Sequence, residues 1–219
     1  MCRLTSVVVL VFMSSVAAAA ATPASKTFDP SPYSQTVTGC DRLAAHPEDP
    51  FKIVPGLETA QVDFQAAIAA CRIALSQDAN NPRIQYQLAR ALTYAGQIKE
   101  GLPLIEQAAA LKYPQALFVT GYLHLDGFAG APKDPCRAAE LPRESAVYGR
   151  LAGIVGFPAY ALEGRFEGCA ADPDAADIAV FLEAAGSLTT DYYQGLLINV
   201  LRRQAAPTTS QEGQIARFD

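Results

Sequence analysis

Residues 85–114 read QYQLARALTYAGQIKEGLPLIEQAAALKYP, and this stretch decides the fold. Apolar and small residues recur at three- and four-residue steps on both sides of Gly96, which is the spacing of one face of an α-helix. Gly96 ends the first helix, and a second is expected from about Ile98 to Leu111. Pro103 falls in or near the first turn of that second helix, where a missing N–H costs little. The stretch therefore predicts a helical hairpin.

The same pattern continues on both sides of this hairpin. Upstream, one helix is expected from Gln61 to just before Asp78, and the next from Pro82 to about Ala95. Downstream helices are expected over Pro114 to Asp126, Asp134 to Gly153 with a kink allowed at Pro142, Pro158 to Glu167, Pro173 to Ala185, and Thr189 to Gln204. No run of alternating β-branched residues predicts a strand, so the expected fold is all-α. Helices that repeat every 35–40 residues indicate a right-handed solenoid of helical hairpins.

The chain divides into four parts. Residues 1–21 have the pattern of a secretory signal peptide: Arg3 precedes an apolar run from Leu4 to Val16, and small residues follow from Ala17 to Ala21. A retained signal anchor is the competing interpretation. Residues 22–60 are expected to be a Pro-rich irregular segment, 61–204 the helical repeat domain, and 205–219 a flexible tail. The signal predicts an exported protein, in the periplasm or outside the cell, with no stable membrane insertion once the signal is removed.

Four cysteines remain once the signal is removed: Cys40, Cys71, Cys136 and Cys169. An even number in an exported chain predicts two disulfides, with three possible connectivities. The pairs Cys40–Cys71 and Cys136–Cys169 are favoured because each closes a loop of about thirty residues, the span of one helical hairpin. Free buried cysteines are the alternative. The run 37–40 (VTGC) resembles a lipoprotein processing site, but it lies too far beyond the apolar run and is interpreted as chance.

Composition supports this interpretation and excludes other classes. Half of the chain is hydrophobic but only 9% is aromatic, and about 40 alanines make up much of the difference. Alanine favours helix and lets helices pack closely. A net charge of −5 argues against binding to a nucleic-acid backbone, which needs clustered Lys and Arg. The mean hydropathy of +0.11 comes largely from residues 1–21.

The stretch quoted above resembles a tetratricopeptide repeat. Leu88-Ala89 stands at the close-packing pair of the first helix, Gly96 at the turn, and Ile105 and Ala108 on the second helix. The family usually has Ala where Gly101 stands in this chain.

The following stretch resembles the related Sel-one-like repeat. Small or acidic residues fall at the positions of that pattern, namely Ala116, Gly121, Gly127, Asp134, Ala138, Ala146 and Gly149. Departures include Thr120 for Leu and His124 for Tyr. A weaker third copy follows, so the resemblance covers about residues 60–186.

In both repeat families the first helix of each hairpin lines a concave surface, and the resemblance implies the same here. It places on that surface, as candidate contacts for a protein or peptide of the cell envelope, Arg83, Tyr86, Arg90, Thr93, Tyr94, Gln115, Phe118, Tyr122, Asp126 and Arg165. Tyrosine and arginine dominate binding hot spots because they combine large area with a polar group. The alternative is that these side chains pack into neighbouring hairpins.

Residues for catalysis are few. No motif for a nucleophile, a metal or a phosphate is present, and we expect no catalytic residue, metal or cofactor. His124 is interpreted as a semi-buried structural residue. The acidic residues near the loops are interpreted as helix caps and first-turn acids, namely Asp126, Asp134, Asp172, Asp174 and Asp177. The alternative to a binding scaffold is an enzyme acting on the cell wall, because cysteine-rich Sel-one-like proteins include members credited with β-lactam binding or hydrolysis.

Overall fold

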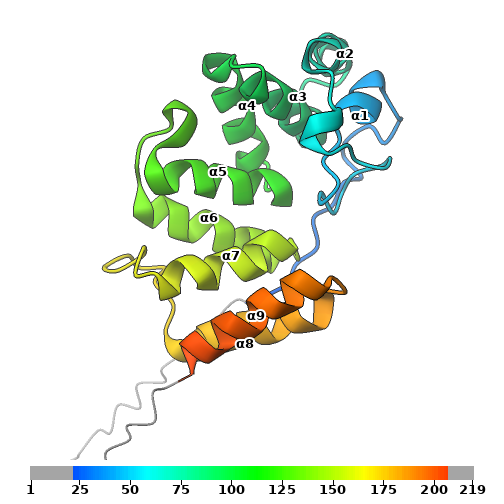
Figure 1. Ribbon diagram of the computed structural model, residues 1–219. Coiled ribbons are helices and arrows are strands. Elements are labelled where there is room, and N and C mark those ends of the chain that lie inside the picture. The colour runs from blue at the N-terminus through cyan, green and yellow to red at the C-terminus, as the bar shows by residue number, and fades with distance from the viewer. Residues whose placement is uncertain (1–21, 207–219) are drawn as a thin grey trace, which may run out of the picture.

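The computed structural model describes residues 22–206 and is a stack of helices (Figure 1). The predicted signal peptide and nearly all of the predicted tail lie outside the described residues. Two short 3-10 helices, Thr59–Gln61 (η1) and Phe128–Gly130 (η2), accompany the α-helices. The α-helices are α1 Gly39–Ala44, α2 Phe64–Gln77, α3 Pro82–Tyr94, α4 Ile98–Ala110, α5 Pro114–Asp126, α6 Pro135–Val147, α7 Leu151–Leu162, α8 Ala175–Leu188 and α9 Tyr192–Ala205.

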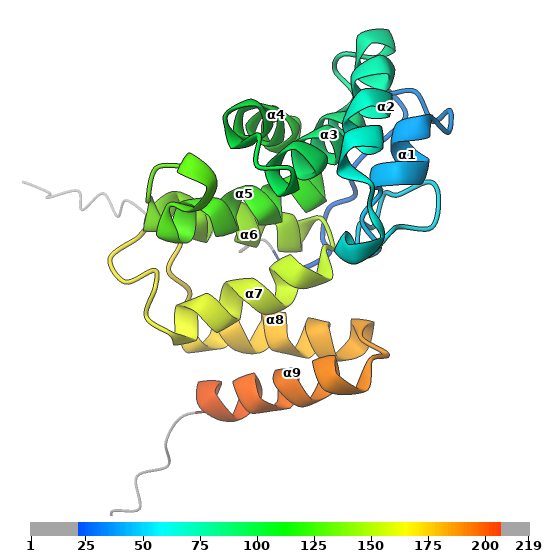
Figure 2. The ribbon, with the colours of Figure 1, turned by 45° about the horizontal axis from the view of Figure 1, so that its top comes forward.

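Each helix from α2 onward packs against the one before it, and the strongest pairs are α3 with α4 and α5 with α6. Figure 2 shows α7, α8 and α9 as successive layers at the C-terminal end of the stack. The described residues contain no strand. The predicted all-α fold of stacked helical hairpins is thus confirmed. None of the described helices is long and apolar enough to cross a membrane.

Glycines in the left-handed region end several of these helices. Gly96, Gly127 and Gly149 have φ values of 79°, 75° and 79°, which side chains other than glycine rarely adopt. The break at Gly149 corrects one predicted boundary. The sequence favoured a helix through to Gly153 and a new one from Pro158, but the chain turns at Gly149 and Pro158 lies inside α7.

Two disulfides join the elements, with the predicted connectivity. Cys40 on α1 bonds Cys71 on α2 with an S–S distance of 1.97 Å, and Cys136 on α6 bonds Cys169 in the α7–α8 loop at 2.03 Å. Cys40 is fully buried. Because its sulfur is bonded to Cys71, it is not available for the lipid that the 37–40 pattern would require.

The N-terminal segment differs from the irregular lead-in that its prolines indicated. It contains α1, which begins with a capping box in which Thr38 and Asp41 satisfy each other's backbone N–H groups. Before α1, the segment lies along the stack. The backbone N–H groups of Ala24 and Lys26 donate to Ala146 and Val147 at the end of α6, at 2.9 and 3.0 Å. Phe28 and Phe51 then pack around Tyr113.

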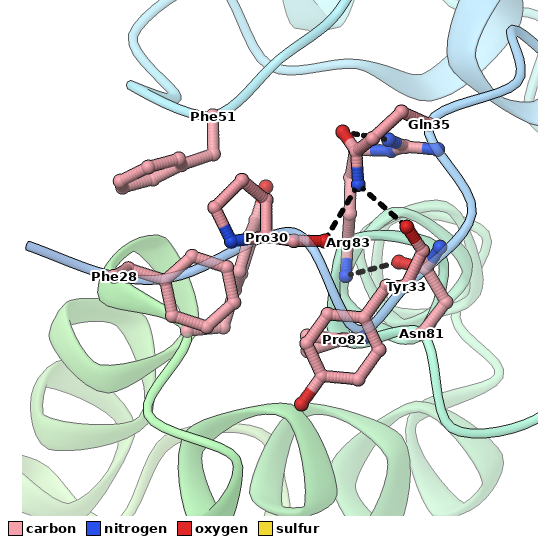
Figure 3. Close-up of a pocket in the computed structure, with 9 residues that line it drawn as sticks. Phe28, Pro30, Tyr33, Gln35, Phe51, Asn81, Pro82 and Arg83 are labelled. Atoms are coloured by element: carbon pink, nitrogen blue, oxygen red, sulfur yellow. Dashed lines mark hydrogen bonds between the residues drawn. The ribbon is translucent and has the colours of Figure 1, made fainter.

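Figure 3 shows this segment against the start of α3. Phe28, Pro30 and Tyr33 lie beside Pro82 and Arg83, and the cavity between them has a volume of only about 10 Å³. That is room for about one water molecule, so the segment fills the surface that it covers.

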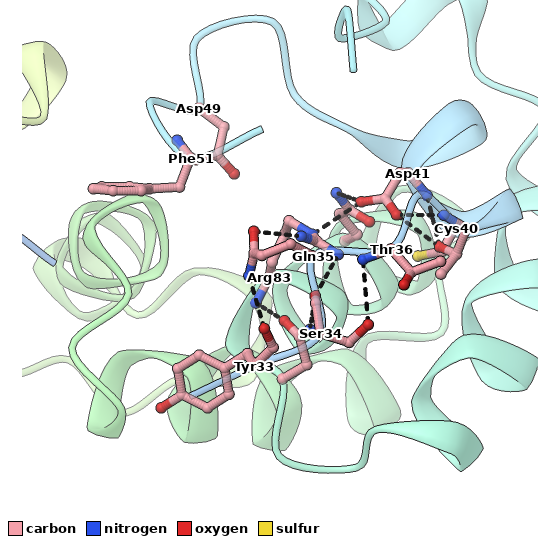
Figure 4. A network of polar contacts seen from close by, with 12 residues as sticks. Tyr33, Ser34, Gln35, Thr36, Cys40, Asp41, Asp49, Phe51 and Arg83 are labelled. Carbon is pink, nitrogen blue, oxygen red and sulfur yellow. Dashed lines mark hydrogen bonds and ion pairs between the residues drawn. The ribbon is translucent and has the colours of Figure 1, made fainter. Parts of the chain in front are cut away.

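A buried ion pair fixes the segment in place (Figure 4). Arg83 Nε lies 2.9 Å from Asp41 Oδ1, with both side chains almost fully buried. Asp41 also accepts from Thr38 and from Gln87 Nε2, and the terminal nitrogens of Arg83 donate to Gln35 and to the Ser34 carbonyl. Both carboxylate oxygens of Asp41 and both terminal nitrogens of Arg83 thus have polar partners, so burial of these charges is tolerated.

Candidate functional site

The main candidate site is a pocket between α3 and α5, with a volume of about 530 Å³. One face of each helix supplies most of its lining, because residues three or four positions apart share a helix face. Helix α3 contributes Tyr86, Ala89, Arg90, Thr93 and Tyr94, and α5 contributes Gln115, Phe118, Val119, Tyr122 and Leu123. The rest of the lining comes from other segments, namely His46, Ile105, Phe128, Ala129 and Arg150.

The pocket brings together seven of the ten residues predicted as candidate partner contacts. Those that line it are Tyr86, Arg90, Thr93, Tyr94, Gln115, Phe118 and Tyr122. Their convergence follows from the hairpin fold, which sets α3 and α5 as the first helices of neighbouring hairpins (Figure 1).

The other three, Arg83, Asp126 and Arg165, lie elsewhere. Arg83 is 4% exposed and pairs with Asp41 beneath the N-terminal segment. Arg165, beyond the end of α7, donates to Asp126 Oδ1 at 2.5 Å. This ion pair lowers the pKa of Asp126, so both groups are engaged with each other.

The expected exposure was wrong for four residues. Gln115 on α5 is 2% exposed, between Tyr86 and Arg150, and the other three lie on α3. Arg83, Tyr86 and Arg90 are only 2–6% exposed, because the N-terminal segment covers α3. The guanidinium of Arg90 donates to the carbonyls of Ala44, Ala45 and Leu57 at 2.8–3.0 Å. The prolines of the segment predict an irregular lead-in, and a lead-in would leave the first repeat uncovered.

Aromatic rings form the rim of the pocket. Tyr122 stacks on Phe128 with ring centroids 5.3 Å apart, and Tyr94 stacks on Phe64 at 5.6 Å. Tyr94, Tyr122 and Phe128 are all exposed. Exposed rings around a hollow offer apolar area with a polar edge, which is the surface chemistry of binding hot spots.

The floor of the pocket is cationic. Arg150, from the α6–α7 turn, is 6% exposed and its Nε donates to Gln115 Oε1, while Gln115 Nε2 donates to the Tyr86 hydroxyl at 3.0 Å. Within residues 22–206 the terminal nitrogens of Arg150 have no hydrogen-bond partner, and no carboxylate lies within 4.0 Å of them. Burial lowers the pKa of Arg150, but arginine stays protonated in proteins. The floor therefore presents a positive charge without a matching anion.

His46 adds a neutral imidazole at the edge of the same pocket. Burial, together with Arg90, Arg150 and Lys52, lowers the pKa of His46 to about 4. Its Nδ1 accepts from the Glu48 backbone N–H at 3.0 Å, which requires an unprotonated nitrogen. Sequence reasoning did not place His46 or Arg150 at the site, because each comes from a connecting segment with no repeat position.

Behind the floor lies a buried carboxyl group. Asp49 is fully buried and accepts from the Tyr113 hydroxyl at 2.7 Å and from the Phe51 backbone N–H at 2.9 Å. Desolvation raises the pKa of Asp49 despite these two donors. The carboxyl group joins the covering segment to α5 and does not line the pocket.

Neither histidine belongs to a nucleophile–base arrangement in the described residues. His124 is buried, with Nδ1 2.8 Å from the Pro132 carbonyl and Nε2 2.8 Å from Glu106 Oε1, as expected of a structural histidine. The capping role predicted for loop acids holds for Asp134 and Asp174, which cap α6 and α8. Across residues 22–206, no group of three or more His, Cys, Asp or Glu side chains could hold a metal ion.

Comparison with known proteins gives one structural likeness. No family model matches the chain, and no curated protein matches it. Among solved structures, a Sel1 repeat protein from Oxalobacter formigenes is similar, with a TM-score of 0.48 and 19% sequence identity. The match covers 67% of this chain and 66% of that chain. The chain is thus similar in part to a Sel1 repeat protein, and its described residues form a disulfide-stapled stack of helical hairpins.

Proposed function

We propose that this protein is an exported helical-repeat scaffold that binds a protein or peptide of the cell envelope in the pocket between α3 and α5. The observation that carries the proposal is the combination of an exposed aromatic rim with a buried, unmatched arginine in the floor. Apolar walls stabilise a bound side chain through burial, and an arginine fork recognises a carboxylate. The preferred segment therefore carries a carboxylate beside an apolar or aromatic side chain.

The binding role is tested by photo-crosslinking in the native compartment. A photo-reactive phenylalanine replaces Tyr122 in the rim, and the matched control carries it at Ile73, a more exposed apolar position on α2 that does not line the pocket. A crosslinked partner is expected from position 122 and not from 73. Crosslinks of equal yield from both positions, or from neither, would contradict a partner site at the pocket.

The chemistry of the floor is tested with the captured partner segment as a synthetic peptide. Arg150→Met removes the cation and keeps much of the side-chain volume, so binding is expected to weaken by about tenfold or more, in line with a lost charge-assisted contact. Neutralising the peptide carboxylate in the unaltered protein is expected to cause the same loss. The two changes together are expected to cost no more than either alone, and full additivity would contradict the contact.

Export is supported by the apolar N-terminus of the sequence and by two disulfides, which persist in oxidising compartments. Cell fractionation, with N-terminal sequencing of the recovered protein, is the test. We expect a chain that begins near residue 22 in the periplasm or the medium. A full-length chain with free thiols in the cytoplasm would overturn this part of the proposal.

A further inference from the structure

Arg150 in the pocket between α3 and α5 carries a charge for which the described residues supply no anion. The side chain is only 6% exposed, and its terminal nitrogens have no hydrogen-bond partner in residues 22–206. These nitrogens are not among the buried unpaired atoms either, so they remain open to the pocket. No acidic residue of the described chain lines this pocket. Because a guanidinium forms paired, charge-assisted hydrogen bonds with a carboxylate, the group that the pocket lacks is a carboxylate.

Glu48 does not fill this role. It lines a second, smaller hollow of about 200 Å³ together with Arg150, but the two side chains do not come within the 4.0 Å of an ion pair. The Glu48 side chain is exposed, and the backbone N–H of Glu48 donates to His46 Nδ1 at 3.0 Å. The terminal nitrogens of Arg150 are thus free for a carboxylate that enters the larger pocket.

Aromatic rings accompany this cation in the pocket. Phe118, Tyr122 and Phe128 line it, and the rings of Tyr122 and Phe128 are stacked with their centroids 5.3 Å apart. Tyr122 and Phe128 are 42% and 45% exposed. A further ring that packs against them is stabilised by the apolar area that it removes from water. The pocket therefore fits an aromatic ring that lies next to a carboxylate in the sequence.

The chain itself contains this pair of groups after α9. Residues 207–219 read PTTSQEGQIARFD and lie outside the described residues. Phe218 and Asp219 are neighbours in this stretch. The other acidic residue of the stretch, Glu212, has a glutamine and a glycine as its neighbours. Within residues 207–219, only Phe218 and Asp219 thus place a ring beside a carboxylate.

Residues 207–219 are long enough to return to the pocket. Leu197, near the start of α9, lines the same small hollow as Arg150. From Leu197 to Ala206 the helix rises about 14 Å, at about 1.5 Å per residue. The residues from 207 to 219 span up to about 43 Å when they are extended. The stretch therefore covers the way back along α9 and has length left to enter the pocket.

We propose that residues 215–219 dock in the pocket between α3 and α5 of their own chain, with the side-chain carboxylate of Asp219 on Arg150 and the ring of Phe218 against the aromatic wall. This docking rests on the proposed function and adds its regulation, because a partner from the cell envelope then binds only by displacing the segment. The segment is tethered, so its effective concentration is on the order of mM and a weak contact is enough to hold it.

A photo-reactive phenylalanine at position 218 of the full chain, with both disulfides formed, tests the docking. Crosslinks to Tyr122 or Phe128 are expected by mass spectrometry, at a yield that does not change with protein concentration. Arg150→Met in the same chain is expected to lower that yield several-fold. Arg72→Met is the matched control, because it removes an exposed cation outside the pocket, and it is expected to leave the yield unchanged.

Two results of the crosslinking would overturn docking within one chain. The first is a set of crosslinks spread over the surface without preference for the pocket. The second is a yield that rises with protein concentration, because it would place the segment in the pocket of another copy.

A synthetic peptide with the sequence of residues 207–219 measures the contact separately. It is expected to bind a chain that ends at residue 206, which keeps all the described helices. It is expected to bind the full chain more weakly, because the tethered segment competes for the pocket. Equal affinity for the two chains, or no binding to the shortened one, would overturn the proposal.

Matched substitutions assign the contacts of the peptide. Arg150→Met in the shortened chain and Asp219→Asn in the peptide are each expected to weaken binding about tenfold, as for one lost charge-assisted contact. The two changes together are expected to cost no more than either alone. Phe218→Ser in the peptide is also expected to weaken binding. A peptide of the same composition in scrambled order that binds equally well would overturn the proposal.

Failure of this docking is distinguishable from failure of the proposed function. A partner captured from position 122, in a protein that gives no pocket crosslink from position 218, would overturn the docking and leave the proposed function standing. Phe218→Ser with Asp219→Asn in the full chain is expected to raise the partner yield at position 122 several-fold, because the pocket is then free. An unchanged yield would overturn the regulatory role. A pocket crosslink from position 218 without any partner in that double variant would support the docking and contradict the proposed function.

Discussion

At the scale of single residues, charged groups hold this molecule together from inside. Asp41 and Arg83 form a buried pair that ties the N-terminal segment to α3. A buried charge that loses its partner is costly, whereas an exposed pair contributes little. The chain contains both kinds, since the pair of Asp126 with Arg165 is partly exposed.

Asp41→Asn is expected to lower the free energy of unfolding by about 3–5 kcal/mol, because it leaves the guanidinium of Arg83 buried without its anion. Chemical denaturation of the oxidised protein measures this loss. Asp126→Asn is the matched control, and little change in stability is expected there because solvent screens its ion pair with Arg165. Equal effects of the two substitutions would contradict the distinction.

His46 predicts a pH dependence of stability. Its pKa is about 4 in the folded protein and about 6.5 in the unfolded chain, so between these values the unfolded chain binds a proton that the folded one does not. The free energy of unfolding is therefore expected to fall as the pH drops from 6.5 to 4, and this contribution levels off below pH 4. Asp49 acts in the opposite sense, because its raised pKa favours the folded state as the pH falls.

The comparison of the unaltered chain with His46→Asn isolates the histidine, since Asp49 contributes to both. Asn keeps an oxygen near the position of Nδ1 to accept the Glu48 N–H. Denaturation across this pH range is expected to show a flatter profile for the variant. Parallel profiles would contradict the lowered pKa of His46.

At the scale of helices, two glycines show how the space around a position decides whether glycine is required there. A Cβ on Gly101 would lie 2.8 Å from Thr93 Oγ1 and 3.1 Å from the Ala89 carbonyl, so the close approach of α3 and α4 requires glycine. This explains the departure from the Ala that the tetratricopeptide pattern usually has there. Gly195 in α9 has no such neighbour within 4 Å.

Gly195→Ala is therefore expected to stabilise the protein by about 1 kcal/mol through helix propensity. Gly101→Ala is expected to destabilise it by about 1–3 kcal/mol through overpacking. Thermal unfolding under one set of conditions compares the two variants directly. The same sign for both would show that close packing is not what distinguishes these positions.

At the scale of the whole molecule, the two disulfides have different tasks. Cys40–Cys71 joins the covering segment to α2, and Cys136–Cys169 joins α6 to the loop after α7. Their sequence separations of 31 and 33 residues imply a stabilisation of about 3–4 kcal/mol each in the chain-entropy model. The thermodynamic effects are thus similar, but the segments they restrain differ.

Replacing Cys40 and Cys71 together by Ala is expected to free the covering segment. Arg42 and Lys52 are already exposed, but local unfolding of the backbone around them is expected to make both sites cleavable by trypsin. Replacing Cys136 and Cys169 is expected to lower stability by a similar amount without raising cleavage at those two sites. Limited proteolysis with mass spectrometry measures both. Equal cleavage in the two variants would contradict a specific role of the first disulfide.

Much of the fold could be predicted from the periodicity of the sequence, whereas less of the candidate site could be predicted. The boundaries of α5 and the disulfide pairs follow from Pro114, Gly127 and cysteine spacing, which are local signals. The burial of Arg90 could not be predicted, because its partners are carbonyls 33–46 residues upstream in a segment without a repeat. Arg150 was missed for the same reason, since a turn residue reaches the pocket only through the packing of α5 on α6.

The N-terminal segment has a mechanical consequence. A stack of helical hairpins behaves as an elastic spring, since each repeat contacts only its neighbours and the stack bends at the joints between them. Here residues 24–36 run from the end of α6 to the start of α3, hydrogen-bonded at both ends. They link the α3–α4 hairpin to the α5–α6 hairpin and limit how far the two can move apart. The width of the pocket between α3 and α5 is therefore restricted before any ligand binds.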